Sequence, residues 1–166
     1  MAKTAAVNPW PHAGDYPSTR AMVRAKDTQT WYPTEFCYQN ATGLYQLAAT
    51  DAQVVKGYFT QVQSTSTSST DVEVAFHTAD TKYLGYLSNG DADIAATRTH
   101  MGNQYAVHVG DINGLGVLTF DVADSSNVAV RITDLYWLME TSGHTASSAT
   151  PALVEAQFIQ TVVEAA

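Results

Sequence analysis

The sequence predicts an all-β protein: a small antiparallel β-barrel or sandwich with an extended N-terminal arm. One observation is a series of apolar runs with a period of two, clearest over residues 104–135, where Tyr105, Val107 and Val109 alternate with smaller or polar residues. The other is the turn chemistry between these runs, Asn-Gly in one place and Asp-Ser-Ser in the next. Alternation interrupted by such turns is typical of half-buried strands joined by short connections.

The segment before residue 36 has a different composition. It holds four of the five prolines, with aromatic residues among them. Proline removes a backbone donor and keeps the preceding residue extended, so a regular helix or a central strand is not expected here. The sequence therefore predicts an extended arm over residues 1–35 and a β-barrel or sandwich domain over residues 36–166. The arm either packs on its own domain or reaches a partner, and the candidate partner-binding residues are Trp10, Tyr16, Trp31 and Tyr32.

Short strands are expected along the first part of the domain. They are a hairpin over residues 35–47 and strands at 53–63, 71–76, 82–87 and 93–97, about eight strands with those of residues 104–135. Gly57 marks a bulge or a close approach of two backbones. Residues 64–70 are seven consecutive Ser and Thr residues and predict an exposed, flexible loop.

Beyond residue 135 the alternation is lost, and residues 141–150 have the composition of a loop. The tail over residues 152–163 fits two patterns. Val154, Ala156 and Phe158 fit one face of a strand, whereas Ala152, Ala156 and Ile159 fit one face of a helix. Because so much of the chain is predicted to form strands, we favour a strand for this tail.

Composition excludes several classes of function. The formal charge is −8, with 8 Lys and Arg against 16 Asp and Glu, so a nucleic-acid partner is not expected because phosphate binding needs clustered basic residues. No apolar run is long enough to span a membrane, and the N-terminal residues lack the apolar core of a signal peptide, so we expect neither a membrane partner nor secretion. Cys37 is the single cysteine and is expected to be a small buried side chain.

No arrangement of residues predicts catalysis, so the protein is not expected to be an enzyme, and neither a cofactor nor a metal ion is expected. The five histidines are scattered without metal-ligand spacing. His77 and His108 lie on predicted strands opposite the apolar face, which indicates surface positions. The glycine-rich stretch at residues 110–116 has neither the lysine of a phosphate loop nor the spacing of a calcium loop, and is predicted to be a hairpin turn.

Four stretches carry a resemblance to a known family. They are Lys-Tyr-Leu-Gly-Tyr at 82–86, Gln-Tyr-Ala-Val-His-Val at 104–109, Val-Ala-Val-Arg-Ile-Thr-Asp-Leu at 128–135 and Val-Glu-Ala-Gln-Phe at 154–158. In this order and over residues 50–163, the chain resembles capsid decoration (cement) proteins and related head structural proteins of tailed bacteriophages. The motifs are hydrophobic strand blocks, so no functional residue is transferred.

The resemblance implies a non-enzymatic virion protein that is assembled in the host cytoplasm, binds the major capsid protein and stabilises the head shell. It also implies a homo-oligomer, with a trimer favoured, and an N-terminal arm that grips the shell. A second hypothesis is a carbohydrate- or receptor-binding β module of a virion fibre, in which Trp10, Trp31 or Trp137 would stack on sugars.

Overall fold

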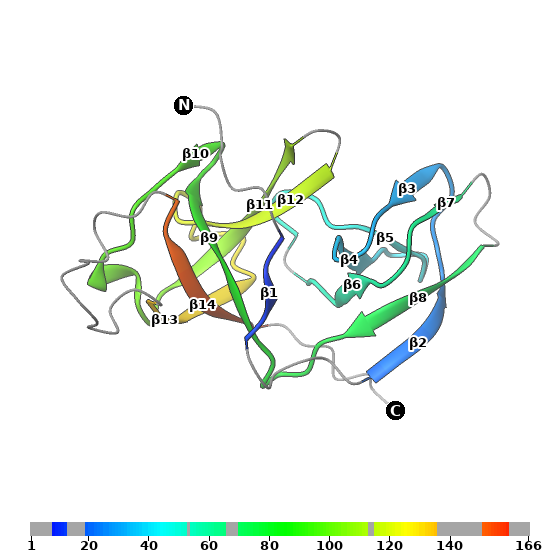
Figure 1. Cartoon of the computed structure of the whole chain (residues 1–166), viewed down its shortest axis with the longest axis horizontal. Coiled ribbons are helices and arrows are strands. Elements are labelled where there is room, and N and C mark those ends of the chain that lie inside the picture. The colour runs from blue at the N-terminus through cyan, green and yellow to red at the C-terminus, as the bar shows by residue number, and fades with distance from the viewer. Residues whose placement is uncertain are drawn as a thin grey trace.

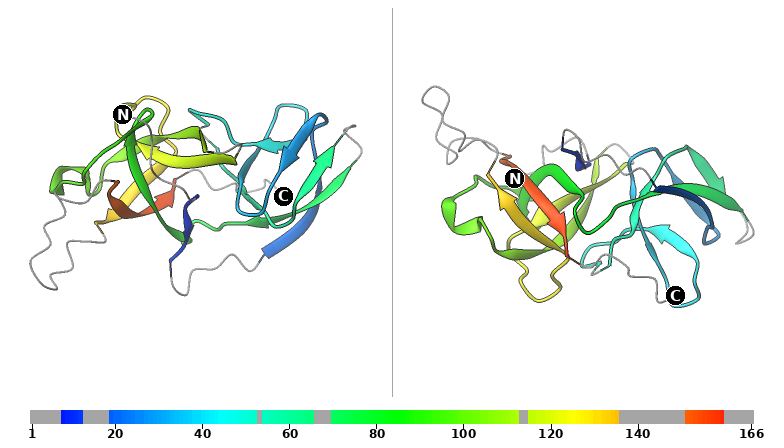
Figure 2. Two further views of the ribbon diagram at one scale, coloured as in Figure 1. Left: turned by 45° about the horizontal axis from the view of Figure 1, so that its top comes forward. Right: turned by 90° about the horizontal axis from the view of Figure 1, so that it is seen from below.

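The computed structural model of the chain describes residues 8–12, 19–52, 54–65, 70–112, 115–135 and 151–159. In these residues the regular structure is β-strand, apart from one 3-10 turn at Arg98–His100, which confirms the predicted all-β class. The strands form two lobes that lie side by side along the long axis of the molecule (Figures 1 and 2). Within the described ranges, no helix has the length and apolar character needed to cross a membrane.

The first lobe, the barrel lobe, is a closed ring of five strands. They are β9 (Lys82–Asn89), β11 (Gln104–Ile112), β12 (Leu115–Asp121), β13 (Val130–Asp134) and β14 (Leu153–Phe158). Pairing follows the order β9–β12–β11–β13–β14, and β14 then pairs with β9. The β9–β12 pair is parallel and the other four pairs are antiparallel. Two short strands, β1 (Trp10–Pro11) and β10 (Ala92–Asp93), also pair with β9.

Apolar side chains from successive strands fill the barrel. Tyr83 and Leu87 of β9, Val107 of β11, Phe120 of β12 and Ile132 of β13 are all fully buried. A small barrel of this kind has no room for a channel, because the inward side chains occupy its interior. Closure also satisfies the backbone hydrogen bonds on both sides of each strand, and so removes the edges that an open sheet exposes.

The second lobe, the sheet lobe, has the strand order β2–β8–β6–β4–β5. These are β2 (Thr19–Arg24), β8 (Asp71–Phe76), β6 (Gly57–Phe59), β4 (Phe36–Gln39) and β5 (Tyr45–Leu47), while β3 (Gln29–Trp31) and β7 (Gln63–Thr65) pair with each other. The sheet curls until its first and last strands meet at one isolated parallel bridge, Ala25 to Tyr45. A single bridge does not close it, so β2 keeps one side unpaired among the described residues.

Aromatic side chains join the two lobes. The ring of Phe36 lies 5.5 Å from the rings of both Tyr83 and Phe158. The imidazole of His77 stacks on Phe158 at 4.7 Å. Because edge-to-face and offset aromatic pairs contribute beyond their buried area, this cluster fixes the sheet lobe against the barrel lobe.

The arm predicted over residues 1–35 requires correction. Of this range the structure describes residues 8–12 and 19–35, and they belong to the sheets: β1 pairs with β9, β2 with β8, and β3 with β7. Two of the prolines that suggest an arm stand at a strand end and in a turn, and Pro17 lies outside the described residues. Pro11 ends the two-residue β1, and Pro33 lies in the turn after β3. The domain boundary at residue 35 therefore does not separate an arm from a barrel.

Other sequence predictions have mixed outcomes. The hairpin is confirmed as the β4–β5 pair, whose turn is held by the Asn40 side chain accepting from the backbone N–H groups of Thr42 and Leu44. The tail is a strand, β14, as favoured, while residues 160–163 lie outside the described part. The strand expected over 53–63 is instead two strands with different partners, and the edge strand expected at 93–97 is the two-residue β10. Residues 66–69 of the predicted loop, and all of 141–150, also lie outside it.

Gly57 occupies a close approach between two strands, as predicted. A Cβ atom added there would lie 2.0 Å from the backbone oxygen of Ala75 on β8. No side chain fits in that space, so only glycine allows β6 to pack on β8 at this register.

Candidate partner-binding surface

The four residues predicted to bind a partner do not share a surface. Trp31 is fully buried and its ring stacks on Phe59 at 4.7 Å, inside the core of the sheet lobe. This prediction is wrong for Trp31, because a side chain inside a core cannot reach a partner. Tyr32, the next residue, is 40% exposed, Trp10 is half-buried against Tyr86, and Tyr16 lies outside the described residues.

The segment that carries Trp10 is fastened to the barrel lobe by one carboxylate. Glu155 of β14 accepts from the Nδ1 atom of His12 at 2.5 Å, from the Nζ atom of Lys82 at 3.0 Å and from the hydroxyl of Thr133 at 2.6 Å. The Asn8 side chain adds a bond from the backbone N–H of Leu118 at 2.7 Å. Residues 8–12 are thus a fixed part of the barrel wall.

The electrostatics of Glu155 agree with this structural role. Its burial raises the pKa, but the hydrogen bonds from Thr133, Lys82 and His12 outweigh that effect and hold the pKa below its ordinary value. The carboxylate is therefore charged at neutral pH and fully engaged by donors. Such a group stabilises the strands around it and is not placed to transfer a proton.

Among the described residues, β2 is the longest strand that pairs on one side only. It pairs with β8 on one side, and on its other side no strand of the described ranges pairs with it before the bridge at Ala25. Met22, in the middle of the strand, is 64% exposed. A row of unpaired N–H and C=O groups is a template on which an extended segment of another chain can add as a new strand.

A cavity of about 490 Å³ lies beside this edge. Apolar and aromatic residues from three strands contribute to its walls, and the basic residue Lys56 also lines it. The lining residues are Thr19, Ala21, Met22, Val23, Tyr45, Lys56, Phe76 and His77. Its volume falls within the range of pockets that hold small ligands or single large side chains.

His77 differs from its prediction as a surface residue. It follows β8, is 7% exposed, and packs between Phe158 and Tyr83. Neither ring nitrogen has a hydrogen-bond partner. Burial lowers its pKa to about 4, with the backbone of Val55 opposing this change. The ring is therefore neutral at pH 7 and serves as a packing element, since desolvation disfavours its charged form. The apolar alternation of the sequence does not predict the burial of His77, because His77 lies just after the end of β8, where the alternation stops.

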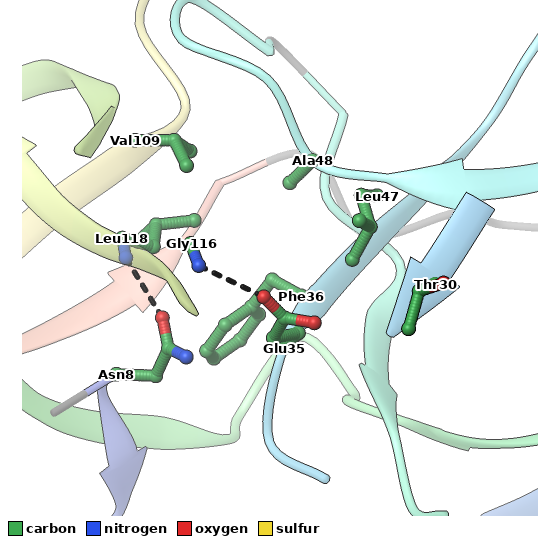
Figure 3. A pocket seen from close by; sticks show the side chains of 9 residues that line it. All are labelled: Asn8, Thr30, Glu35, Phe36, Leu47, Ala48, Val109, Gly116 and Leu118. Atoms are coloured by element: carbon green, nitrogen blue, oxygen red, sulfur yellow. Dashed lines mark hydrogen bonds between the residues drawn. The ribbon is translucent and has the colours of Figure 1, made fainter. Parts of the chain in front are cut away.

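A second, smaller cavity of about 240 Å³ lies where the two lobes meet (Figure 3). Glu35, which is 5% exposed, stands in it and accepts from the backbone N–H groups of Gly116 at 2.9 Å and Tyr32 at 2.8 Å. These two bonds connect the start of β4 to β12 and to the turn after β3. A carboxylate with both oxygens engaged by backbone donors serves as a brace between lobes, and the remaining lining is mostly apolar.

Reactive groups are few in the described ranges. They contain no group of three or more His, Cys, Asp or Glu residues that could hold a metal ion. Cys37 is a free thiol, fully buried as predicted, and burial raises its pKa well above the ordinary value. A thiol in that state is a poor nucleophile, because the thiolate is the reactive form.

Comparison of the chain with protein-family models, with curated proteins and with solved structures found no match. The candidate partner-binding surface is therefore identified from geometry alone. It is the open side of β2 together with the adjoining cavity.

Proposed function

We propose that this chain is a structural protein of a tailed-phage virion, a capsid decoration protein that binds the major capsid protein and stabilises the head shell. The motifs in residues 82–86, 104–109, 128–135 and 154–158 motivate the family, and they correspond to parts of strands of the barrel lobe. The protein would be made in the host cytoplasm and would act on the assembled virion. It would bind to the head shell and would not catalyse a reaction.

One observation supports adhesion most directly: the open side of β2. Most proteins protect a long strand edge by covering it or by closing the sheet. Here the neighbouring lobe closes completely, while the sheet lobe leaves six residues, Thr19–Arg24, paired on one side among the described strands. Strand addition at such an edge gives affinity through main-chain hydrogen bonds and specificity through side-chain pockets.

We also propose that the protein assembles with itself, most simply as a homotrimer. The surface is low in charge, with Asp, Glu, Lys and Arg making up 14% of the chain. Surfaces depleted in charge are typical of the centres of protein interfaces. Sedimentation equilibrium at micromolar concentration should give three times the mass of the chain, and a monomer over the whole range would refute this part of the proposal.

The test of the proposed function is co-sedimentation with empty head shells of the phage that encodes the chain. Wild-type protein should sediment with the shells in a saturable manner, and Met22→Glu should bind at least about tenfold more weakly, because it places a charge in the centre of the interface. Val62→Glu is the matched control, since Val62 is 61% exposed but lies away from β2. Absence of saturable binding by the wild-type protein would contradict the proposal.

The alternative function, a carbohydrate- or receptor-binding module, loses one of its supporting residues. Trp31 is fully buried and cannot stack on a sugar, and Trp10 is held against Tyr86 with only part of its ring accessible. Trp137 lies outside the described residues. No arrangement of exposed aromatic rings among the described residues favours this alternative.

A further inference from the structure

We infer that the segment that adds to β2 is an extended acidic strand, one of whose apolar side chains enters the cavity beside it. This rests on the proposed function, because it names the chemistry of the partner at the same surface. The inference follows from the two faces of β2, from the charges along it and from the position of the cavity.

The two faces of β2 differ in character. In a strand, alternate side chains point to opposite faces, so Thr19, Ala21 and Val23 share one face. These three residues line the cavity. The other face carries Arg20, Met22 and Arg24, of which Met22 also borders the cavity, and in β2 as a whole every residue except Val23 is exposed. An added strand would therefore place every second side chain over the cavity, and the intervening ones beside the two arginines.

Basic charge is concentrated near this edge although the chain as a whole is acidic. The formal charge of the chain is −8, yet four of its eight Lys and Arg residues stand on β2, just after it, or at the border of the cavity. They are Arg20, Arg24, Lys26 and Lys56. The strand β2 itself has no acidic residue, and the carboxylates beside its two arginines belong to Glu73 and Asp71 of the neighbouring strand β8.

The existing ion pairs of the two arginines leave them able to engage a partner. Arg20 lies 3.3 Å from Glu73 and Arg24 lies 3.6 Å from Asp71, both on β8. The two arginine side chains are 58% and 60% exposed. Exposed pairs of this kind contribute little stability, so each guanidinium can also bind a carboxylate on its other side at small cost. Opposite charges directly across two strands stabilise the pairing, and like charges oppose it.

The cavity provides room for an apolar side chain on the inner face. Its floor includes Val23, Tyr45 and Phe76, and Tyr45 and Phe76 make an edge contact at 5.8 Å. At about 490 Å³ it accommodates a leucine or phenylalanine side chain with space remaining. His77 adds an aromatic wall whose ring nitrogens have no protein partner. The complementary segment thus alternates acidic with large apolar residues.

A second copy of this chain fits the same edge less well. In the antiparallel register that places Met22 opposite Met22, each Arg20 faces an Arg24 of the other copy. Like charges directly opposite are destabilising, and charged residues on edge strands are a common means of preventing self-association. The arginines therefore favour an acidic partner over a β2–β2 dimer.

The probe for this inference is a synthetic hexapeptide of alternating glutamate and leucine, with an alternating lysine and leucine peptide as its matched control. Fluorescence anisotropy with the full chain should show the acidic peptide binding at least about tenfold more tightly than the basic one. The double variant R20E/R24E should reverse that preference, while R131E, an exposed arginine of the barrel lobe, should leave it unchanged. Ala21→Trp, which fills the cavity, should weaken binding without lowering the melting temperature.

Equal affinity for both peptides, or an R20E/R24E variant with unchanged preference, would overturn the inference. Self-association of the wild-type chain that R20E/R24E abolishes would also overturn it, in favour of a second copy. Head-shell binding distinguishes the two proposals. If R20E/R24E leaves shell binding intact, the acidic strand is refuted and the decoration function stands. If the chain prefers the acidic peptide but does not bind the shells, the decoration function is refuted and the acidic strand stands.

Discussion

The two lobes are both built from antiparallel strands for the most part but differ in whether the sheet closes. In the barrel lobe every member of the ring is paired on both sides, including the six-residue β14. In the sheet lobe the six-residue β2 is paired on one side among the described strands, because the first and last strands meet only at the Ala25–Tyr45 bridge. Closure leaves the ring strands of the first lobe paired on both sides, whereas the described part of the second lobe keeps the open side of β2 that we propose as the binding surface.

The largest expected difference between the lobes follows from deletion of residues 1–30. This deletion takes away β1, β2 and two of the three residues of β3, which leaves the edge of β8 that pairs with β2 open and removes most of the strand that pairs with β7. Amide-exchange mass spectrometry should show protection lost through β4, β6 and β8 but retained in the barrel lobe. Uniform protection equal to that of the whole chain would mean that this segment is an independent arm after all.

A smaller effect is expected from Trp31→Ala, which leaves a cavity in the core of the sheet lobe. The side chain is fully buried and stacked on Phe59, so the expected loss is about 3–5 kcal/mol of unfolding free energy in urea titration. Tyr32→Ala is the neighbouring control. Its side chain is 40% exposed and its truncation should change stability by about 0.5 kcal/mol or less. Equal losses from the two variants would place Trp31 on the surface.

His77, at the junction of the lobes, should make stability depend on pH. Its pKa is lowered to about 4 from an ordinary value of 6.5, so between these values the unfolded chain binds more protons than the folded one. Stability is therefore full above pH 6.5 and falls as the pH is lowered towards 4, by on the order of 3 kcal/mol. His77→Phe should flatten this slope in urea titrations across the range. An unchanged slope would show that His77 is hydrated in the folded protein.

Sequence reasoning found the strands of the barrel lobe and the all-β class, but not which strands pair with one another. Tyr105, Val107 and Val109 show the period of a half-buried strand, and such local signals predicted the all-β class. Which strands pair depends on contacts between residues far apart in the chain, such as the parallel pairing of Phe120 with Leu87, and periodicity carries no information about these. The closed ring could therefore be expected only as one of two architectures.

The open edge was missed for a different reason. Residues 1–35 were treated as one segment because of their prolines, although Thr19, Ala21 and Val23 already alternate with Arg20 and larger side chains. That alternation was a usable signal for β2. The burial of Trp31 had no comparable signal, since an aromatic residue two positions before a proline fits an arm and a core equally well. Only the stack on Phe59 distinguishes them.

The smallest expected effect concerns the fastening of residues 8–12 to the barrel lobe. Hydrogen bonds from Thr133, Lys82 and His12 hold the pKa of Glu155 below its ordinary value of 4.5. A lowered carboxylate pKa stabilises the folded state above the ordinary value, and this contribution is lost as the pH falls through the folded pKa. Glu155→Gln should cost about 1–2 kcal/mol at pH 7 and progressively less in acid. Asp80→Asn, an exposed carboxylate in a turn, is the control; a similar cost for both would show that the cluster is not specific.

Among the described residues, the barrel lobe is closed and the sheet lobe keeps one open strand, β2. Residue-resolved amide exchange by NMR tests it most directly, because β2 and β14 have six residues each and serve as matched strands. Amides of β14, paired with β13 and β9, should all be protected to a similar degree. In β2 the amides should alternate between slow exchange, where they face β8, and fast exchange on the open side. Uniform protection along β2, equal to that of β14, would contradict the account, because it would show that the edge is already covered.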